Sequence, residues 1–264
     1  MLEKKTRMKP NLHTEPKALG CNEPVHSSYC SRCGQPVPLR RIDWRYFTQE
    51  IGAFSFTNNR MVYTIRKVVL TPGNSVRHFL TKDRNRFVNP ITFLIITSLI
   101  YAFVGNLFWI DAQNFRLVQM DINASSPNEN GQTIYPTLRL LINWMINYRG
   151  YTSIMSGFFA ALLVKLFFRR SNYNLFEIFA LLCFLSGISS LFFSIVFVAQ
   201  GVTSVNLLNI SSIIVMVYSV WGIGQFFGEK KANNYLKAGV SYLIGILTLG
   251  ALVVLTAIFI DSVF

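Results

Sequence analysis

One stretch decides the class of fold: residues 174–199 read NLFEIFALLCFLSGISSLFFSIVFVA. Glu177 is the one charged side chain in it. A bilayer core about 30 Å thick is crossed by roughly 20 apolar residues in a helix. Hydrocarbon offers no partner for backbone N–H and C=O groups, so such a segment forms an α-helix, which pairs them internally. The stretch therefore predicts a transmembrane helix.

Four further stretches have the same character. Only 14% of the chain is charged and 52% is hydrophobic, whereas soluble proteins carry about 25% charged residues. These values exclude a water-soluble globule and predict an all-α polytopic membrane protein. The five expected spans are about 91–110, 151–168, 174–199, 202–227 and 238–260. We divide the chain into a flexible N-terminus (1–41), a segment of cytoplasmic helices (42–89) and a five-helix transmembrane domain (90–264).

Basic residues set the expected orientation. Residues 1–89 carry 16 Lys+Arg against 6 Asp+Glu, while residues 111–150 carry three of each. The short loop between the second and third spans holds Arg169 and Arg170. Positive charge thus alternates from side to side, as it does when cytoplasmic loops are basic. We expect a multi-pass protein of the inner (cytoplasmic) membrane with the N-terminus inside and the C-terminus outside.

The N-terminal segment contains a candidate metal site. Cys30 and Cys33 are spaced as in a zinc knuckle, where two thiolates on a tight turn reach one Zn²⁺. Cys21 is the natural third ligand, and the fourth is His26, His13 or absent. A reducing cytoplasm favours a metal thiolate over a disulfide. Structural zinc is the only cofactor we expect; the alternatives are two free thiols or a redox pair.

Residues 42–89 predict short amphipathic helices. Asp43, Asn59 and Asn74 are each placed to cap one, because apolar residues recur after them at helical spacing. Such basic helices beside a span are expected to lie on an anionic leaflet. Nucleic acid is a less favoured partner, since the charges flank a membrane span. The expected membrane-surface residues are Arg60, Arg66, Lys67, Arg77, Lys82, Arg84 and Arg86.

Several motifs follow one another in a recognisable order: Cys30-x-x-Cys33-Gly34, Pro72-Gly73, Arg84-x-Arg86, Asn89-Pro90 before a span, and the block 168–177. In this order they resemble an uncharacterised bacterial membrane family, the domain of unknown function 3667, over roughly residues 18–200. The resemblance implies an inner-membrane protein with a zinc-ribbon-like N-terminus, and it implies no activity. Two positions depart from the family pattern: Ala18 replaces a cysteine, and Ile178 replaces the histidine after Glu177.

Two ionisable residues within the spans are functional candidates, because burying a charge in hydrocarbon is costly. Glu177 and Lys165 flank the Arg169-Arg170 loop. The favoured interpretation is that Glu177 pairs with Lys165 or Arg169 and braces this hairpin; the alternative is a carboxylate that couples ions or protons. Asn206 and Asn209 share one helix face. There they either form hydrogen bonds between helices, which is the favoured interpretation, or line a polar path.

Enzymatic readings find little support. All three histidines, His13, His26 and His78, precede the first span, and no HExxH, GxSxG or P-loop motif occurs. We therefore expect a non-enzymatic membrane protein whose cytoplasmic head docks a partner or the anionic membrane surface. The expected protein partner is another protein or a second copy of this chain. The alternative is a small-solute or ion permease that uses Glu177, Lys165 and the Asn206/Asn209 face.

Overall fold

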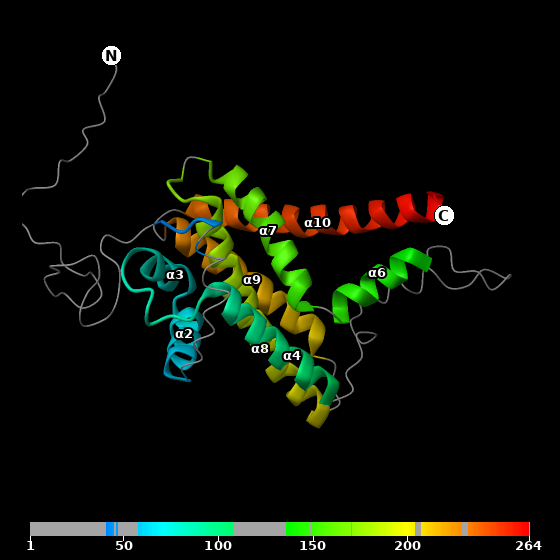
Figure 1. Cartoon of the computed structure of the whole chain (residues 1–264), viewed down its shortest axis with the longest axis horizontal. Helices are drawn as coiled ribbons and strands as arrows, with labels where there is room; N and C mark the ends of the chain where they lie inside the picture. Colours follow the sequence, from blue (N-terminus) through cyan, green and yellow to red (C-terminus); the bar gives the residue numbers. More distant parts are fainter. Residues whose placement is uncertain are drawn as a thin grey trace, which may run out of the picture.

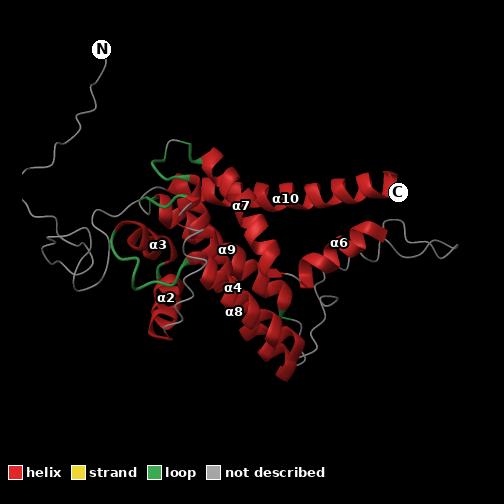
Figure 2. Cartoon of the chain, in the orientation of Figure 1, coloured by secondary structure: helices red, strands yellow, loops and turns green. Residues whose placement is uncertain are grey.

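The structure is a computed structural model that describes residues 41–44, 46, 58–107, 136–147, 149–169, 171–203, 207–228 and 232–263. Within these ranges the regular structure is entirely helical, without strands (Figure 2), as the composition predicts. The helices are α2 (Asn58–Leu70), α3 (Pro72–Thr81), α4 (Pro90–Leu107), α6 (Pro136–Asn147), α7 (Arg149–Phe167), α8 (Leu175–Thr203), α9 (Leu208–Phe227) and α10 (Ala232–Val263).

Four of the described helices are long and apolar enough to cross a membrane: Pro90–Leu107, Leu175–Thr203, Leu208–Phe227 and Ala232–Asp261. These correspond to four of the five expected spans. The expected span at 151–168 lies in α7, whose apolar part is shorter, Ile154–Phe167. Five spans are therefore not confirmed. The last helix also begins earlier than the expected residue 238, at Ala232.

Helix α8 forms the centre of the bundle. Of its most apolar window 72% is buried, against 6% for α10. Helices α4, α7 and α9 pack around α8, whereas α10 packs on α7 and α9 and then runs outward beside α6 (Figure 1). The exposed side of α10 is apolar, including Leu247, Leu255 and Phe259. A helix that buries so little and exposes such side chains suits contact with lipid.

The short helices α2 and α3 fold back against this bundle. Helix α3 buries Val76, Phe79 and Leu80. The ring of Phe79 lies edge-on to Phe87 (5.8 Å) and to Phe184 of α8 (5.5 Å). Such aromatic pairs contribute about 0.5–1.5 kcal/mol beyond their buried area. The apolar face of α3 is thus covered by protein and is not available to enter a leaflet.

Candidate functional site at the basic end of the bundle

One end of the bundle gathers most of the candidate residues. There the C-terminal ends of α7 and α9 meet the N-terminal ends of α8 and α10, with α2 and α3 packed against them (Figure 1). Asn234 of α10, for example, donates to the carbonyl of Phe227 at the end of α9 at 3.1 Å. The described basic residues at this end, on these helices or in the segments next to them, are Arg41, Arg60, Arg66, Lys67, Arg77, Lys82, Arg84, Arg86, Lys165, Arg169 and Lys237. We call this the basic end.

Helix α3 is capped by a side chain from α9. Pro72 occupies its first position, and Thr71 before it makes no side-chain cap bond. The Oε1 atom of Gln225 accepts instead from the backbone N–H of Gly73 (2.8 Å) and of Asn74 (3.3 Å). These are two of the donors that every helix N-terminus leaves unpaired. Asn74, predicted to cap α3, therefore lies in its first turn.

Gly73 makes the close approach of α3 and α9 possible. A Cβ atom at this position would lie against the backbone nitrogen of Phe226 and 2.6 Å from the carbonyl oxygen of Gly222. Only glycine fits backbone this close to backbone. The contact brings Gln225 within reach of the N-terminus of α3.

Arg77 completes the junction from the other side. Its Nη2 donates to the carbonyl of Gln225 at 3.0 Å and to Oδ1 of Asn74. A carbonyl at a helix C-terminus has no partner within its own helix, so this bond satisfies it. Arg77 also bonds the side chain of Tyr173, where burial raises the pKa of the phenol and Arg77 opposes that rise. The guanidinium of Arg77, a predicted membrane-surface residue, is therefore bonded to protein groups within the structure.

The other predicted surface residues divide into two groups. Arg84 is half-buried: it donates to the carbonyl of Leu80 at 3.2 Å and lies 5.5 Å from the ring centre of Tyr46. Five side chains are exposed: Arg60, Arg66, Lys67, Lys82 and Arg86. Arg86 pairs with Asp83 at 3.1 Å. The open basic surface is thus smaller than the sequence pattern suggests.

Glu177 braces the start of α8. Its Oε2 accepts from the backbone N–H of Asn174 at 2.7 Å, as the glutamate of a capping box does. Arg41 clasps both carboxylate oxygens, from Nε and Nη2, at 3.2 Å each, and also donates to the carbonyl of Asn172. The Glu177 side chain is 8% exposed and that of Arg41 60%. In the described contacts the ion-pair partner of Glu177 is Arg41, whereas the sequence predicted Lys165 or Arg169.

Lys165 holds the same turn by different bonds. Its Nζ donates to the carbonyls of Ser171 (3.3 Å) and Tyr173 (2.5 Å). Both carbonyls belong to the connection between α7 and α8, so Lys165 ties the end of α7 to this connection. Lys165 and Glu177 therefore both bind the connection between α7 and α8. The described contacts include no ion pair between them.

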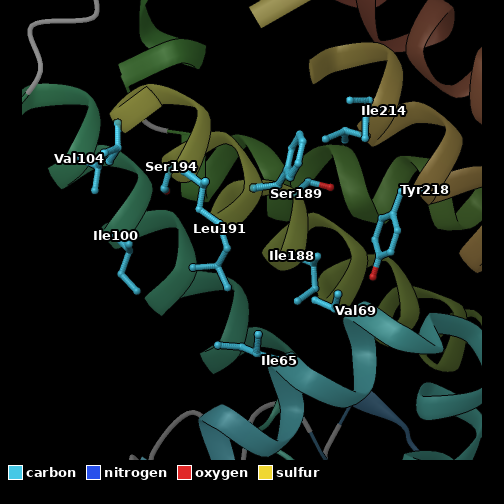
Figure 3. Close-up of a pocket in the computed structure, with 14 residues that line it drawn as sticks. Ile65, Val69, Ile100, Val104, Ile188, Ser189, Leu191, Ser194, Ile214 and Tyr218 are labelled. Atoms are coloured by element: carbon cyan, nitrogen blue, oxygen red, sulfur yellow. The ribbon is translucent and has the colours of Figure 1, made fainter. Parts of the chain in front are cut away.

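An apolar groove runs along the bundle beside this end (Figure 3). Its volume is about 610 Å³. Helix α2 forms one end of it with Ile65 and Val69, and α4, α8 and α9 form the sides. The lining residues are Ile65, Val69, Ile100, Val104, Ile188, Ser189, Leu191, Phe192, Ser194, Ile195, Val198, Ile214, Val215 and Tyr218. Sequence reasoning missed the groove because four separate helices build it.

A second, smaller cavity of about 130 Å³ lies between α8, α9 and α10. Four serines and Tyr242 contribute to its lining. A cavity of this size has room for water molecules, since one water needs only about 10–15 Å³. The Ser189, Ser190 and Ser219 hydroxyls in its wall donate to carbonyls of their own helices.

Several predicted residues cannot be placed. Cys21, His26, Cys30, Cys33 and Asn206 lie outside the described residues. Among the residues that the structure does describe, no group of three His, Cys, Asp or Glu side chains could hold a metal. The described partner of Asn206, Asn209, is half-buried in the first turn of α9. This is the end of the bundle opposite to Glu177.

These features define a helical protein suited to a membrane, with one basic end. Residues 58–102, which form α2, α3 and most of α4, match the sequence profile of a family described as a protein of unknown function (DUF3667). The matched segment includes Gly73 and Arg77 of the α3–α9 junction. The cysteines at 30 and 33 and the block 168–177 lie outside it. Neither the curated proteins nor the solved structures contain a match to the chain.

Proposed function

We propose that this chain is a non-enzymatic protein of the inner (cytoplasmic) membrane whose basic end rests on the anionic leaflet. One observation carries the proposal: the outer face of α2 is apolar, exposed and interrupted by an arginine. Val62 is 62% exposed, Val69 44% and Leu70 61%. Arg66, which is also exposed, lies among them.

Helical geometry places these four residues together. At 3.6 residues per turn, Val62, Arg66, Val69 and Leu70 fall within an arc of about 100°. The buried residues Met61, Thr64 and Val68 occupy the other side, against the protein. An apolar strip with a cation in it suits the boundary between headgroups and acyl chains, where arginine extends to the phosphates.

Charge supports the same placement. The exposed cations Arg60, Arg66, Lys67, Lys82 and Arg86 belong to α2 and to the turn after α3. Each cation near an anionic leaflet contributes about 1 kcal/mol to membrane attachment. The proposal includes five spans, namely the four candidate helices and α7, and a cytoplasmic N-terminus. With five spans, α7 and α9 end at the basic end and α8 and α10 begin there, so that the basic end lies on the cytoplasmic side.

The zinc knuckle and a protein partner or second copy remain predictions of the same account. If Cys30 and Cys33 hold zinc, the purified chain will carry close to one zinc per molecule. The Cys30→Ser/Cys33→Ser variant will then lose it. Unchanged metal content in that variant would eliminate the knuckle.

The permease alternative rests on weaker observations. It needs Glu177, Lys165 and the Asn206/Asn209 face to act on one path. Glu177 lies in the first turn of α8, a helix of 29 residues, and Asn209 follows the connection at its other end. At about 1.5 Å per residue the two ends are separated by about 44 Å. The small serine-lined cavity is the observation that favours a polar path between them.

Hydrogen–deuterium exchange of the full chain in nanodiscs tests the proposal. We expect the backbone of α2 to exchange more slowly when the zwitterionic lipid is partly replaced by an anionic one, with α6 as the internal control. The variant Arg66→Gln/Lys67→Gln should lose that added protection, whereas Lys237→Gln, which removes an exposed cation of the basic end outside α2, should keep most of it. Equal exchange of α2 in both lipids would overturn the proposal.

A further inference from the structure

We propose that the apolar groove binds one acyl chain of an anionic phospholipid, with its phosphate held by Arg66 of α2. The inference deepens the proposed function and rests on it. It goes further by naming a defined lipid site where the proposed function needs only a charged surface. The site is the groove of about 610 Å³ between α4, α8 and α9, closed at one end by α2.

The shape of the groove suits a chain. Its lining on α8 runs from Ile188 to Val198. Ten residues of helix correspond to about 15 Å. From Ile65 and Val69 of α2, labelled in Figure 3, the groove extends along α8 from Ile188 toward Val198, away from the Glu177 end of that helix. A groove of this length along α8 matches a lipid tail that enters from one leaflet.

The chemistry of the lining requires a hydrocarbon occupant. Among the residues that the structure describes, no charged side chain lines the groove, and the three hydroxyls in its lining already donate. Ser189 and Ser194 donate to the carbonyls of Leu185 (2.8 Å) and Ser190 (2.9 Å), and Tyr218 donates to that of Val68 (2.8 Å). Ordered water needs two to four polar partners, which this lining does not supply.

The groove is open toward the surroundings of the bundle. Ile100 is 39% exposed, Ile214 49% and Ile195 67%. These residues lie on α4, α9 and α8, three of the four described helices that are long and apolar enough to span a membrane. In a membrane such an opening meets acyl chains, so a tail enters without crossing a polar barrier.

Arg66 selects an anionic lipid. It lies next to Ile65 and one turn from Val69, the two groove residues of α2, and its side chain is exposed. A tail that fills the groove brings its headgroup to α2. There the planar guanidinium can bond two phosphate oxygens at once. The headgroup of a zwitterionic lipid carries a cation that weakens the attraction between Arg66 and the phosphate. The headgroup of an anionic lipid such as phosphatidylglycerol has no such cation. Charge complementarity therefore favours an anionic phospholipid.

Photo-crosslinking in nanodiscs provides the test. The probe is phosphatidylglycerol with a diazirine on one acyl chain, and the labelled peptides are mapped by mass spectrometry. We expect groove residues such as Ile195 to be labelled and the labelling to be displaced by unlabelled phosphatidylglycerol better than by phosphatidylcholine. The lipid-facing side of α10, at Leu247 and Leu255, serves as the reference, where both competitors should act equally.

Two variants, each with a control variant, sharpen the test. Arg66→Gln should reduce the preference of the groove for phosphatidylglycerol about fivefold, the effect of one cation at an anionic surface. Lys237→Gln should not change it. Ile214→Trp, which fills the groove, should abolish groove labelling while α10 labelling stays; Val254→Trp on the exposed face of α10 is its control.

The outcomes separate the two proposals. Groove labelling that equals α10 labelling, with no preference between lipids, would overturn the lipid site. If α2 still gained protection from exchange in anionic nanodiscs, the proposed function would stand alone. Absent groove labelling in the unmodified chain would also overturn the site, because a groove covered by protein is closed to the probe.

Discussion

The side-chain Oε1 of Gln225 lies 2.8 Å from the backbone nitrogen of Gly73, although 152 residues separate them in the chain. Through this bond the end of α9 caps the start of α3, and Arg77 returns a bond to the Gln225 carbonyl. Helix α3 cannot leave the bundle without unpairing these groups. The junction thus fixes α2, joined to α3 through Thr71, on the basic end.

The first prediction concerns the approach of α3 to α9. Gly73→Ala should lower the thermal stability of the purified chain, because its Cβ would meet the backbone of Phe226 and Gly222. Overpacking of this kind costs about 1–3 kcal/mol. Gly250→Ala is the matched control, since a Cβ at position 250 meets nothing within 4 Å. Equal melting temperatures for the two variants would contradict the close contact.

The second prediction removes the cap. Gln225→Leu keeps the volume but leaves the N–H groups of Gly73 and Asn74 without their acceptor. We expect a loss of about 1–3 kcal/mol in unfolding free energy and faster exchange in the first turn of α3. Ser212→Ala, also on α9, removes only a bond to its own helix at Leu208 and should be nearly neutral. If Gln225→Leu lowered the stability without faster exchange in the first turn of α3, the claim that Gln225 caps α3 would be contradicted.

The sequence predicts those parts of the fold that depend on residues close together in the chain, and it does not predict contacts between distant residues. The spans come from local composition, so residues 174–199 alone predict α8. Helix α2 follows from the spacing of Met61, Ile65 and Val68 around the helix. The start of α3 at Pro72 did not follow, because Asn74 offered a local cap that the remote Gln225 supplants.

The same distinction holds for the candidate site. Asn174-x-x-Glu177 is a local capping signal and could have shown that the carboxylate is occupied. Its second partner, Arg41, lies 136 residues away, and no pattern in the chain connects the two. The groove likewise depends on how four helices cross. A single sequence shows which residues are apolar and does not show which of them face one another.

The third prediction separates the two bonds of Glu177. Because the Arg41 side chain is 60% exposed, solvent screens the ion pair. Arg41→Ala should therefore cost less than about 1 kcal/mol. Glu177→Ala should cost more, since it also removes the cap on Asn174, typically about 1 kcal/mol. A double-mutant cycle read by thermal unfolding measures the coupling. A larger loss for Arg41→Ala than for Glu177→Ala would refute this division.

Glu177→Gln distinguishes bracing from ion coupling. If the carboxylate only braces the turn, this variant should reduce the amount of folded protein in membranes. A coupling carboxylate would instead leave abundance nearly intact and abolish flux. Abundance unchanged beside lost flux would revive the permease alternative.

The fourth prediction concerns pH. Burial lowers the pKa of His78 below its ordinary value of 6.5, and the nearby Lys82 lowers it further. The unfolded chain therefore takes up this proton at a higher pH than the folded one. The stability that depends on neutral His78 is present above pH 6.5 and is lost as pH falls through 6.5 toward the folded pKa. His78→Gln should flatten the melting temperature between about pH 7 and 5; an unchanged slope would contradict this origin.

The most direct test of the central claim is the depth of α2 in the membrane. A fluorophore is placed on Val69→Cys or on Lys82→Cys, with Cys21, Cys30 and Cys33 replaced by serine, in nanodiscs containing anionic lipid. Both positions are exposed in the structure. The account predicts that bromine on the acyl chains quenches the label at 69, while an aqueous quencher reaches the label at 82. Equal aqueous quenching at both positions would contradict the docking of α2 on the membrane.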